Sequence, residues 1–247
     1  MEASKRTTLP ETVGEIEACL RRHSDAERAI GAKRYLKSDL DFLVVAVPDL
    51  RREVRTWAKA HPDPDRTGLS RLCRALWQRD IHELRIFAIE LLRAREDCLE
   101  CSDIALLEWM LQRSNTWAYV DAIAVHLVGP MVERCPQISK ELDRWSRDES
   151  FWLRRSAMLA LLLPLRRGSG DWKRFERYAD DMLGETEFFI RKAIGWVLRE
   201  VSKKDPERVS EFVGSRIERV SGVTFREAVK YLPESDRERL LSAYRSR

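Results

Sequence analysis

Three stretches of this chain place a tryptophan three or four residues from a charged residue. They are TWAYVD (116–121), FWLRRSAM (151–158) and EFFIRKAIGWVLRE (187–200). Residues at this spacing share one face of a helix, so each stretch would present an indole ring beside a charge. Arginine and lysine neutralise phosphates, and aromatic faces contact sugars, bases or cations. These residue types favour a surface that binds nucleic acid.

The pairs themselves are Trp117 with Asp121, Trp152 with Arg155, and Lys192 with Trp196. Each has an alternative interpretation as packing. Asp121 can form a buried ion pair with Arg155 that fixes the register of neighbouring helices, and any of the tryptophans can belong to the core. We interpret five others as packing residues: Trp57, Trp77, Trp109, Trp145 and Trp172.

Gly195 interrupts the third stretch, although glycine inside a helix costs about 1 kcal/mol relative to alanine. Two explanations are open. Either another helix packs tightly against this position, or the glycine lets a binding partner approach the backbone beside Lys192 and Trp196.

The elements that position these residues are helices. Apolar residues recur at three- and four-residue spacing along nearly the whole chain, which predicts an all-α protein. Breaks such as RRGSG (166–170) and KKDPE (203–207) place capping residues or proline at the next helical start. No break resembles a long linker, so we predict one domain over residues 1–247, with residues 1–10 flexible.

A repeat is visible inside the apolar helices. LRIFA (84–88), VDAIA (120–124), LRRSA (153–157), IRKA (190–193) and FREA (225–228) recur about every 33 to 37 residues. This period predicts antiparallel helix pairs of the HEAT type, stacked into a solenoid with a concave basic groove. The repeats align one column of residues along that groove: Arg85, Asp121, Arg154 or Arg155, Arg191 or Lys192, and Arg226.

Composition narrows the classes of function. Residues 151–247 hold 21 lysines and arginines against 15 acidic residues, which favours an anionic partner for this half. The longest apolar run, MLALLLPL, is too short to span a membrane, and no signal-peptide core is present, so we expect a cytoplasmic protein. Cys98 and Cys101 form a CxxC without the second ligand pair that zinc needs, so we predict no metal and no cofactor.

In their order and separations, the three stretches resemble the DNA alkylation repair family of HEAT-like DNA glycosylases, the AlkD-like enzymes. The resemblance runs from about Ala26 to FREAVKYL near the C-terminus, and EFFIRKAIGWVLRE is its most specific part. It places the family's active-site residues on Trp117, Asp121, Arg155 and Trp196, and a tyrosine near the lesion on Tyr35. Two positions depart from the family pattern: Ala118 replaces an aspartate, and Val44 replaces a glycine.

The resemblance implies an enzyme that removes cationic N3- or N7-alkylated purines from double-stranded DNA without inserting the base into a deep pocket. We expect the protein to be a monomer. Asp121, Trp117 and Trp196 would act at the lesion. The predicted DNA-binding residues are Arg155, Tyr35, Arg154, Lys192, Arg191, Arg226 and Arg85. The alternative is a non-catalytic HEAT-repeat module that binds DNA or an acidic protein.

Overall fold

The computed structural model describes residues 8–36, 39–62 and 65–247, with all side chains of these except those of residues 26–30. Secondary structure in this part is helical, apart from one isolated bridge between Asp41 and Ile81. The prediction of an all-α protein is confirmed. No helix in the described ranges has the length and hydropathy needed to cross a membrane.

Of the N-terminal residues 1–10, which the sequence predicts to be flexible, residues 1–7 lie outside the described residues. Thr8 is the N-cap of the first helix, and its backbone N–H donates to Glu11 Oε2 at 2.8 Å. Leu9 and Pro10 form the first turn of that helix. Residues 8–10 thus lie at the capped start of α1, and the flexibility expected of the N-terminus stays a prediction.

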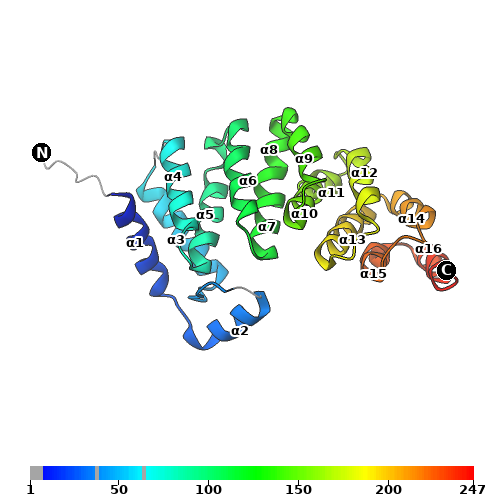
Figure 1. Cartoon of the computed structure of the whole chain (residues 1–247), viewed down its shortest axis with the longest axis horizontal. Helices are drawn as coiled ribbons and strands as arrows, with labels where there is room; N and C mark the ends of the chain where they lie inside the picture. The colour runs from blue at the N-terminus through cyan, green and yellow to red at the C-terminus, as the bar shows by residue number, and fades with distance from the viewer. Residues whose placement is uncertain (1–7, 37–38, 63–64) are drawn as a thin grey trace, which may run out of the picture. The chain divides into compact units, whose positions relative to one another are not determined.

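The chain divides into two compact units, residues 1–122 and 123–247. In the first unit, α5 packs against α3 and α4, and α1 contacts all three (Figure 1). Its core comes from the apolar faces of these four helices together with buried residues of α6 and α7, such as Met110 and Val120. The helices of this unit are α1 (Leu9–Arg21), α2 (Ala26–Leu36), α3 (Val47–Ala60), α4 (Arg66–Trp77), α5 (His82–Ala94), α6 (Ile104–Gln112) and α7 (Trp117–Ile123), which ends at the boundary.

In the second unit, α13 is central and packs against α10, α11, α14 and α15. Figure 1 shows α13 directly beside α15. The helices here are α8 (Gly129–Arg134), α9 (Ser139–Trp145), α10 (Phe151–Leu159), α11 (Leu162–Arg167), α12 (Trp172–Met182), α13 (Phe188–Ser202), α14 (Pro206–Ser215), α15 (Gly222–Ala228), the short η5 (Val229–Tyr231) and α16 (Glu234–Arg245).

The five repeat segments fall in α5, α7, α10, α13 and α15. Of these, α10, α13 and α15 pack one on the next within the second unit. Their helical character is confirmed, whereas the solenoid of all five repeats and its basic groove stay predictions.

Two helices of the second unit begin at aspartates, one directly after the break RRGSG and one within the break KKDPE. Asp171 accepts a hydrogen bond from the backbone N–H of Arg174 at 3.0 Å, and Asp205 accepts one from that of Arg208 at 3.1 Å. Each bond satisfies an N–H that has no partner inside the helix. Local sequence therefore sets where α12 and α14 begin.

Gly195 lies where α13 meets α15. A Cβ at this position would stand 2.7 Å from the Cβ of Glu227 and 3.1 Å from the carbonyl oxygen of Thr224. The glycine therefore serves a tight helix contact, which was the first of its two explanations. The alternative, in which a binding partner approaches this backbone, is wrong because α15 occupies the space.

Candidate functional site

In the first unit, α7 carries the predicted catalytic pair Trp117 and Asp121. Trp117 is the first residue of the helix, and Asp121 follows one turn later; both are half-buried. The exposed ring of Tyr35, on α2, meets the Trp117 ring edge-on, with centroids 5.9 Å apart and an interplanar angle of 88°. The structure thus brings together two aromatic residues that lie 82 positions apart in the sequence.

A buried polar network supports the other face of α7. The hydroxyl of Tyr119 lies 2.6 Å from Nδ1 of His82, whose ring stacks on Phe42. Burial, and to a smaller extent the charge of Arg85, lower the pKa of His82 to about 4, so its imidazole is neutral at pH 7. Burial also raises the pKa of Tyr119, which keeps the phenol protonated. This hydrogen bond holds the helix that carries Trp117 and Asp121.

Arg85 does not lie on an exposed face. It is only 9 % exposed, its guanidinium lies 5.7 Å from the centre of the Trp77 ring, and its Nη2 is 3.4 Å from Asp80. This burial corrects the prediction that Arg85 contributes to an exposed basic column.

The segment before α3 contains the departure at Val44. Its φ angle is +55°, in the left-handed region that a β-branched residue rarely adopts. The carboxylate of Glu83 accepts hydrogen bonds from the backbone N–H groups of Leu43 at 2.8 Å and Val44 at 2.7 Å. Burial raises the pKa of Glu83, although these bonds act in the opposite direction. The family's glycine would adopt this backbone conformation without strain.

In the second unit, Arg155 is 3 % exposed and joins α10 to the first turn of α13. Its Nη1 donates to the carbonyl oxygen of Phe189 at 2.5 Å, and its guanidinium lies 5.8 Å from the Phe189 ring. The neighbouring Arg154 pairs with both carboxylate oxygens of Glu185, at 2.9 and 2.8 Å, and with two backbone carbonyls. Neither Arg154 nor Arg155 is therefore a freely exposed cation, as the predicted basic column required. A phosphate contact by either arginine stays a prediction.

Lys192 and Trp196 lie on the exposed side of α13, one turn apart, and Trp196 is half-buried. Glu227, from α15, forms ion pairs with both Lys192 and Arg199. Burial alone would raise the pKa of Glu227, but the hydrogen bond from Lys192 and the charge of Arg199 outweigh it and leave that pKa below its ordinary value. The carboxylate is therefore ionised at neutral pH and offsets part of the positive charge beside Trp196.

The two remaining predicted DNA-binding residues also lie in the second unit. Arg191 donates from Nε to the carbonyl oxygen of Glu185 at 2.6 Å, and Arg226 is exposed on α15. Any DNA contact by Arg191, Arg226, Lys192 or Tyr35 stays a prediction, as does the joint action of the catalytic set.

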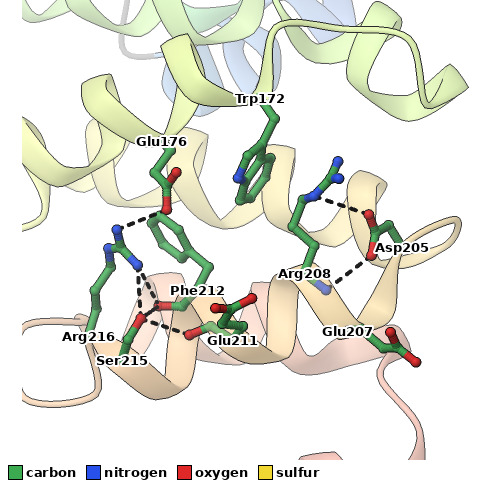
Figure 2. Close-up of a pocket in the computed structure, with 9 residues that line it drawn as sticks. All are labelled: Trp172, Glu176, Asp205, Glu207, Arg208, Glu211, Phe212, Ser215 and Arg216. Atoms are coloured by element: carbon green, nitrogen blue, oxygen red, sulfur yellow. Dashed lines mark hydrogen bonds and ion pairs between the residues drawn. The ribbon is translucent and has the colours of Figure 1, made fainter.

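A surface pocket of about 470 Å³ lies elsewhere in the second unit, along α12 and α14 (Figure 2). Arg208 covers the Trp172 ring at 5.5 Å and pairs with Asp205 at 3.1 Å. Arg216 pairs with Glu176 at 3.0 Å. Because carboxylates neutralise both guanidinium groups, this pocket is a poor candidate for binding a phosphate.

Of the tryptophans interpreted as packing residues, Trp77 and Trp145 are buried, as expected. Trp57, Trp109 and Trp172 are only half-buried. The guanidinium groups of Arg74 and Arg113 each lie 4.6 Å from the centre of the Trp109 ring.

Among the described residues, no cluster of histidine, cysteine, aspartate and glutamate side chains is arranged to hold a metal ion.

The residues that the structure describes form an all-helical fold. The sequence profile of the DNA alkylation repair enzyme family matches residues 16–232. The chain belongs to this family, which confirms the resemblance found in its sequence.

Solved structures similar to this chain include two that are described as follows. One, described as a predicted DNA alkylation repair enzyme from Enterococcus faecalis, is 25 % identical, with a TM-score of 0.77 over 86 % of this chain and 98 % of that one. AlkD2 from Streptococcus mutans is 14 % identical, with a TM-score of 0.62 over 91 % of this chain and 99 % of that one, and shows a likeness of fold alone. A comparison with curated proteins finds no match.

Proposed function

We propose that this protein is a DNA glycosylase that hydrolyses the N-glycosidic bond of cationic N3- or N7-alkylated purines in duplex DNA. The observation that carries the proposal is the Trp117–Asp121 pair on α7, half-buried and joined by the exposed Tyr35, in a chain of the DNA alkylation repair family. A module that only binds DNA has no need to retain a carboxylate beside these rings.

The chemistry requires a carboxylate and no general acid. Alkylation at N3 or N7 makes the purine cationic, so the base takes the electrons of the C1′–N bond and leaves as a neutral molecule. Asp121 stabilises the positive charge that develops at C1′ and accepts a proton from the water whose oxygen bonds to C1′. At about 4 Å and an effective dielectric near 20, this attraction is roughly 4 kcal/mol, or about a thousandfold in rate at most.

The tryptophans have a complementary role. Trp117 and Trp196 offer π faces to the cationic nucleotide and pack against its sugar and backbone, with each contact contributing about 0.5–2 kcal/mol. Both are half-buried, so a face or an edge of each ring is open to a ligand.

The test is single-turnover release of 7-methylguanine, 3-methyladenine, hypoxanthine and uracil from otherwise identical duplexes. We expect release of the two cationic bases only, because a neutral base must leave as an anion or be protonated. Asp121→Asn should lower the rate by two to three orders of magnitude while DNA affinity is equal or slightly higher, since one anion is removed. Comparable release of all four bases would show that a general acid acts.

The same assay decides the rival function. If the wild-type protein binds duplex DNA but releases no base, the chain is a non-catalytic DNA-binding module. If it neither binds DNA nor releases base, an acidic protein becomes the candidate partner. We also propose that the protein acts as a cytoplasmic monomer, which sedimentation with and without DNA and fractionation of cells would test.

A further inference from the structure

A cationic and aromatic patch lies beyond the predicted site, where the end of α13 meets η5. The side chain of Tyr231 is 50 % exposed. The Nζ of Lys203 lies 5.0 Å from the centre of its ring, and that of Lys230 lies 5.7 Å from it. We call Lys203, Lys230 and Tyr231 the Tyr231 patch.

The patch continues the exposed side of α13. Lys192, Trp196 and Arg199 follow one another at intervals of four and three residues, which places them on one face of α13. Lys203, four residues after Arg199, is the C-cap of the helix and still has helical backbone angles, so it continues this face. With a rise of 1.5 Å per residue, Lys203 lies about 10 Å along α13 from Trp196. This distance corresponds to about three base pairs of duplex DNA.

Positive charge is in excess at the C-terminal end of α13. Near Trp196, Glu227 pairs with two cations. At the patch, Glu200 is the shared partner of Lys203 at 2.8 Å and Arg166 at 3.4 Å. Lys230 forms no ion pair among the residues that the structure describes, although it lies near enough to Glu227 for its charge to lower the pKa of that carboxylate. The local excess is therefore positive and is centred on an exposed ring.

Packing alone does not explain this arrangement. Cation–π contacts at exposed sites contribute little to stability, and two ammonium groups on one ring repel each other. A polyanion removes that repulsion. The hydroxyl of Tyr231 also has no hydrogen-bond partner within the described ranges, so its ring and its hydroxyl are both available to a ligand.

We propose that the Tyr231 patch binds the phosphate backbone of duplex DNA about three base pairs from the damaged nucleotide. Lys203 and Lys230 neutralise phosphates, and the Tyr231 ring packs on the adjacent deoxyribose. The position relative to the lesion rests on the proposed function, whereas the binding itself can be measured on undamaged DNA.

The experiment is fluorescence anisotropy with an undamaged 20-base-pair duplex over a series of salt concentrations. Lys203→Ala with Lys230→Ala should weaken binding about tenfold or more at low salt and reduce the slope of log K against log [salt] by about two units. Tyr231→Ala should weaken binding two- to fivefold and keep the wild-type slope, because no charge is removed.

The matched control removes two lysines elsewhere. Lys173 lies on α12, and Lys204 lies in the turn that follows α13, next to Lys203 in the sequence; both are exposed. The variant Lys173→Ala with Lys204→Ala has the same net charge as the patch variant. We expect it to keep the wild-type slope.

The possible results test DNA binding by the Tyr231 patch independently of the proposed glycosylase activity. A wild-type slope in the patch variant, or an equal loss of slope in the control, overturns the patch even if alkylated bases are released. A reduced slope in the patch variant alone supports the patch even if no base is released. A wild-type protein that does not bind the duplex overturns the patch as a DNA contact and points to an acidic protein on this surface.

Discussion

Gly195→Ala tests the contact that positions α15 against α13. The new Cβ would lie 2.7 Å from the Cβ of Glu227, 3.1 Å from the oxygen of Thr224 and 3.2 Å from the Cα of Thr224. Ordinary carbon contacts are about 3.5–4.0 Å, so α15 must move by about 1 Å. Two of the three neighbours are backbone atoms, which cannot rotate away.

Two opposing effects set the change in the free energy of unfolding of Gly195→Ala. Overpacking of this kind costs about 1–3 kcal/mol, and the higher helix propensity of alanine returns about 1 kcal/mol. Because backbone must shift, we expect a net loss of about 1–2 kcal/mol in the free energy of unfolding. The movement of Glu227 should also weaken its ion pairs with Lys192 and Arg199.

The assay is urea denaturation followed by circular dichroism, with Gly14→Ala as the matched control. Gly14 lies inside α1, and a Cβ there would meet nothing within 4 Å. The control should therefore gain about 0.5–1 kcal/mol from helix propensity alone. If Gly195→Ala is as stable as wild type, or gains as much as the control, α15 does not pack on Gly195 as described.

Two further predictions concern the first unit. Val44→Gly should raise the free energy of unfolding by about 0.5–1 kcal/mol. The reason is that the left-handed conformation costs valine about 1–2 kcal/mol, which exceeds the entropy cost of glycine. A lower urea midpoint than that of the wild type would show that Val44 is not strained. The pKa of His82 is about 4 in the folded state and near 6.5 in the unfolded state. As the pH falls, the unfolded state therefore binds the proton first, and the free energy of unfolding decreases between pH 6.5 and pH 4. This loss should reach about 3 kcal/mol and be absent from His82→Asn, as unfolding free energies at pH 7 and pH 4.5 would show.

The helices were predictable because their signals are local. Apolar spacing and capping residues such as Asp171 and Asp205 act within a few positions of one another, and the structure places helix starts where they indicate. The contact between Tyr35 and Trp117 was not predictable from spacing, since it depends on how α2 folds back toward α7. Only the family resemblance indicated Tyr35.

The burial of Arg85 and Arg155 shows where spacing is insufficient. Periodicity assigns a residue to a side of a helix, but a long cationic side chain on that side can point to solvent or lie against an aromatic ring. Arg85 lies over Trp77, and Arg155 lies against Phe189 and donates to its carbonyl oxygen. The support of α7 by His82 was missed for a related reason: in sequence it is a single polar residue with no visible partner.

Under the proposed function, contact with the damaged nucleotide and binding of distant phosphates fall on different parts of the α13 face. Near Trp196, Glu227 pairs with both Lys192 and Arg199 and offsets part of their charge. Under the proposed function, we therefore expect this part of the face to hold DNA more weakly than the Tyr231 patch and to leave the Trp196 ring for the damaged nucleotide. The Tyr231 patch lies about 10 Å further along the helix and keeps its excess charge. Loss of Asp121 should therefore slow base release without weakening binding, and loss of the patch lysines should weaken binding without slowing base release at saturating enzyme. A variant of either kind that changed both quantities in proportion would show that binding and chemistry share the same groups.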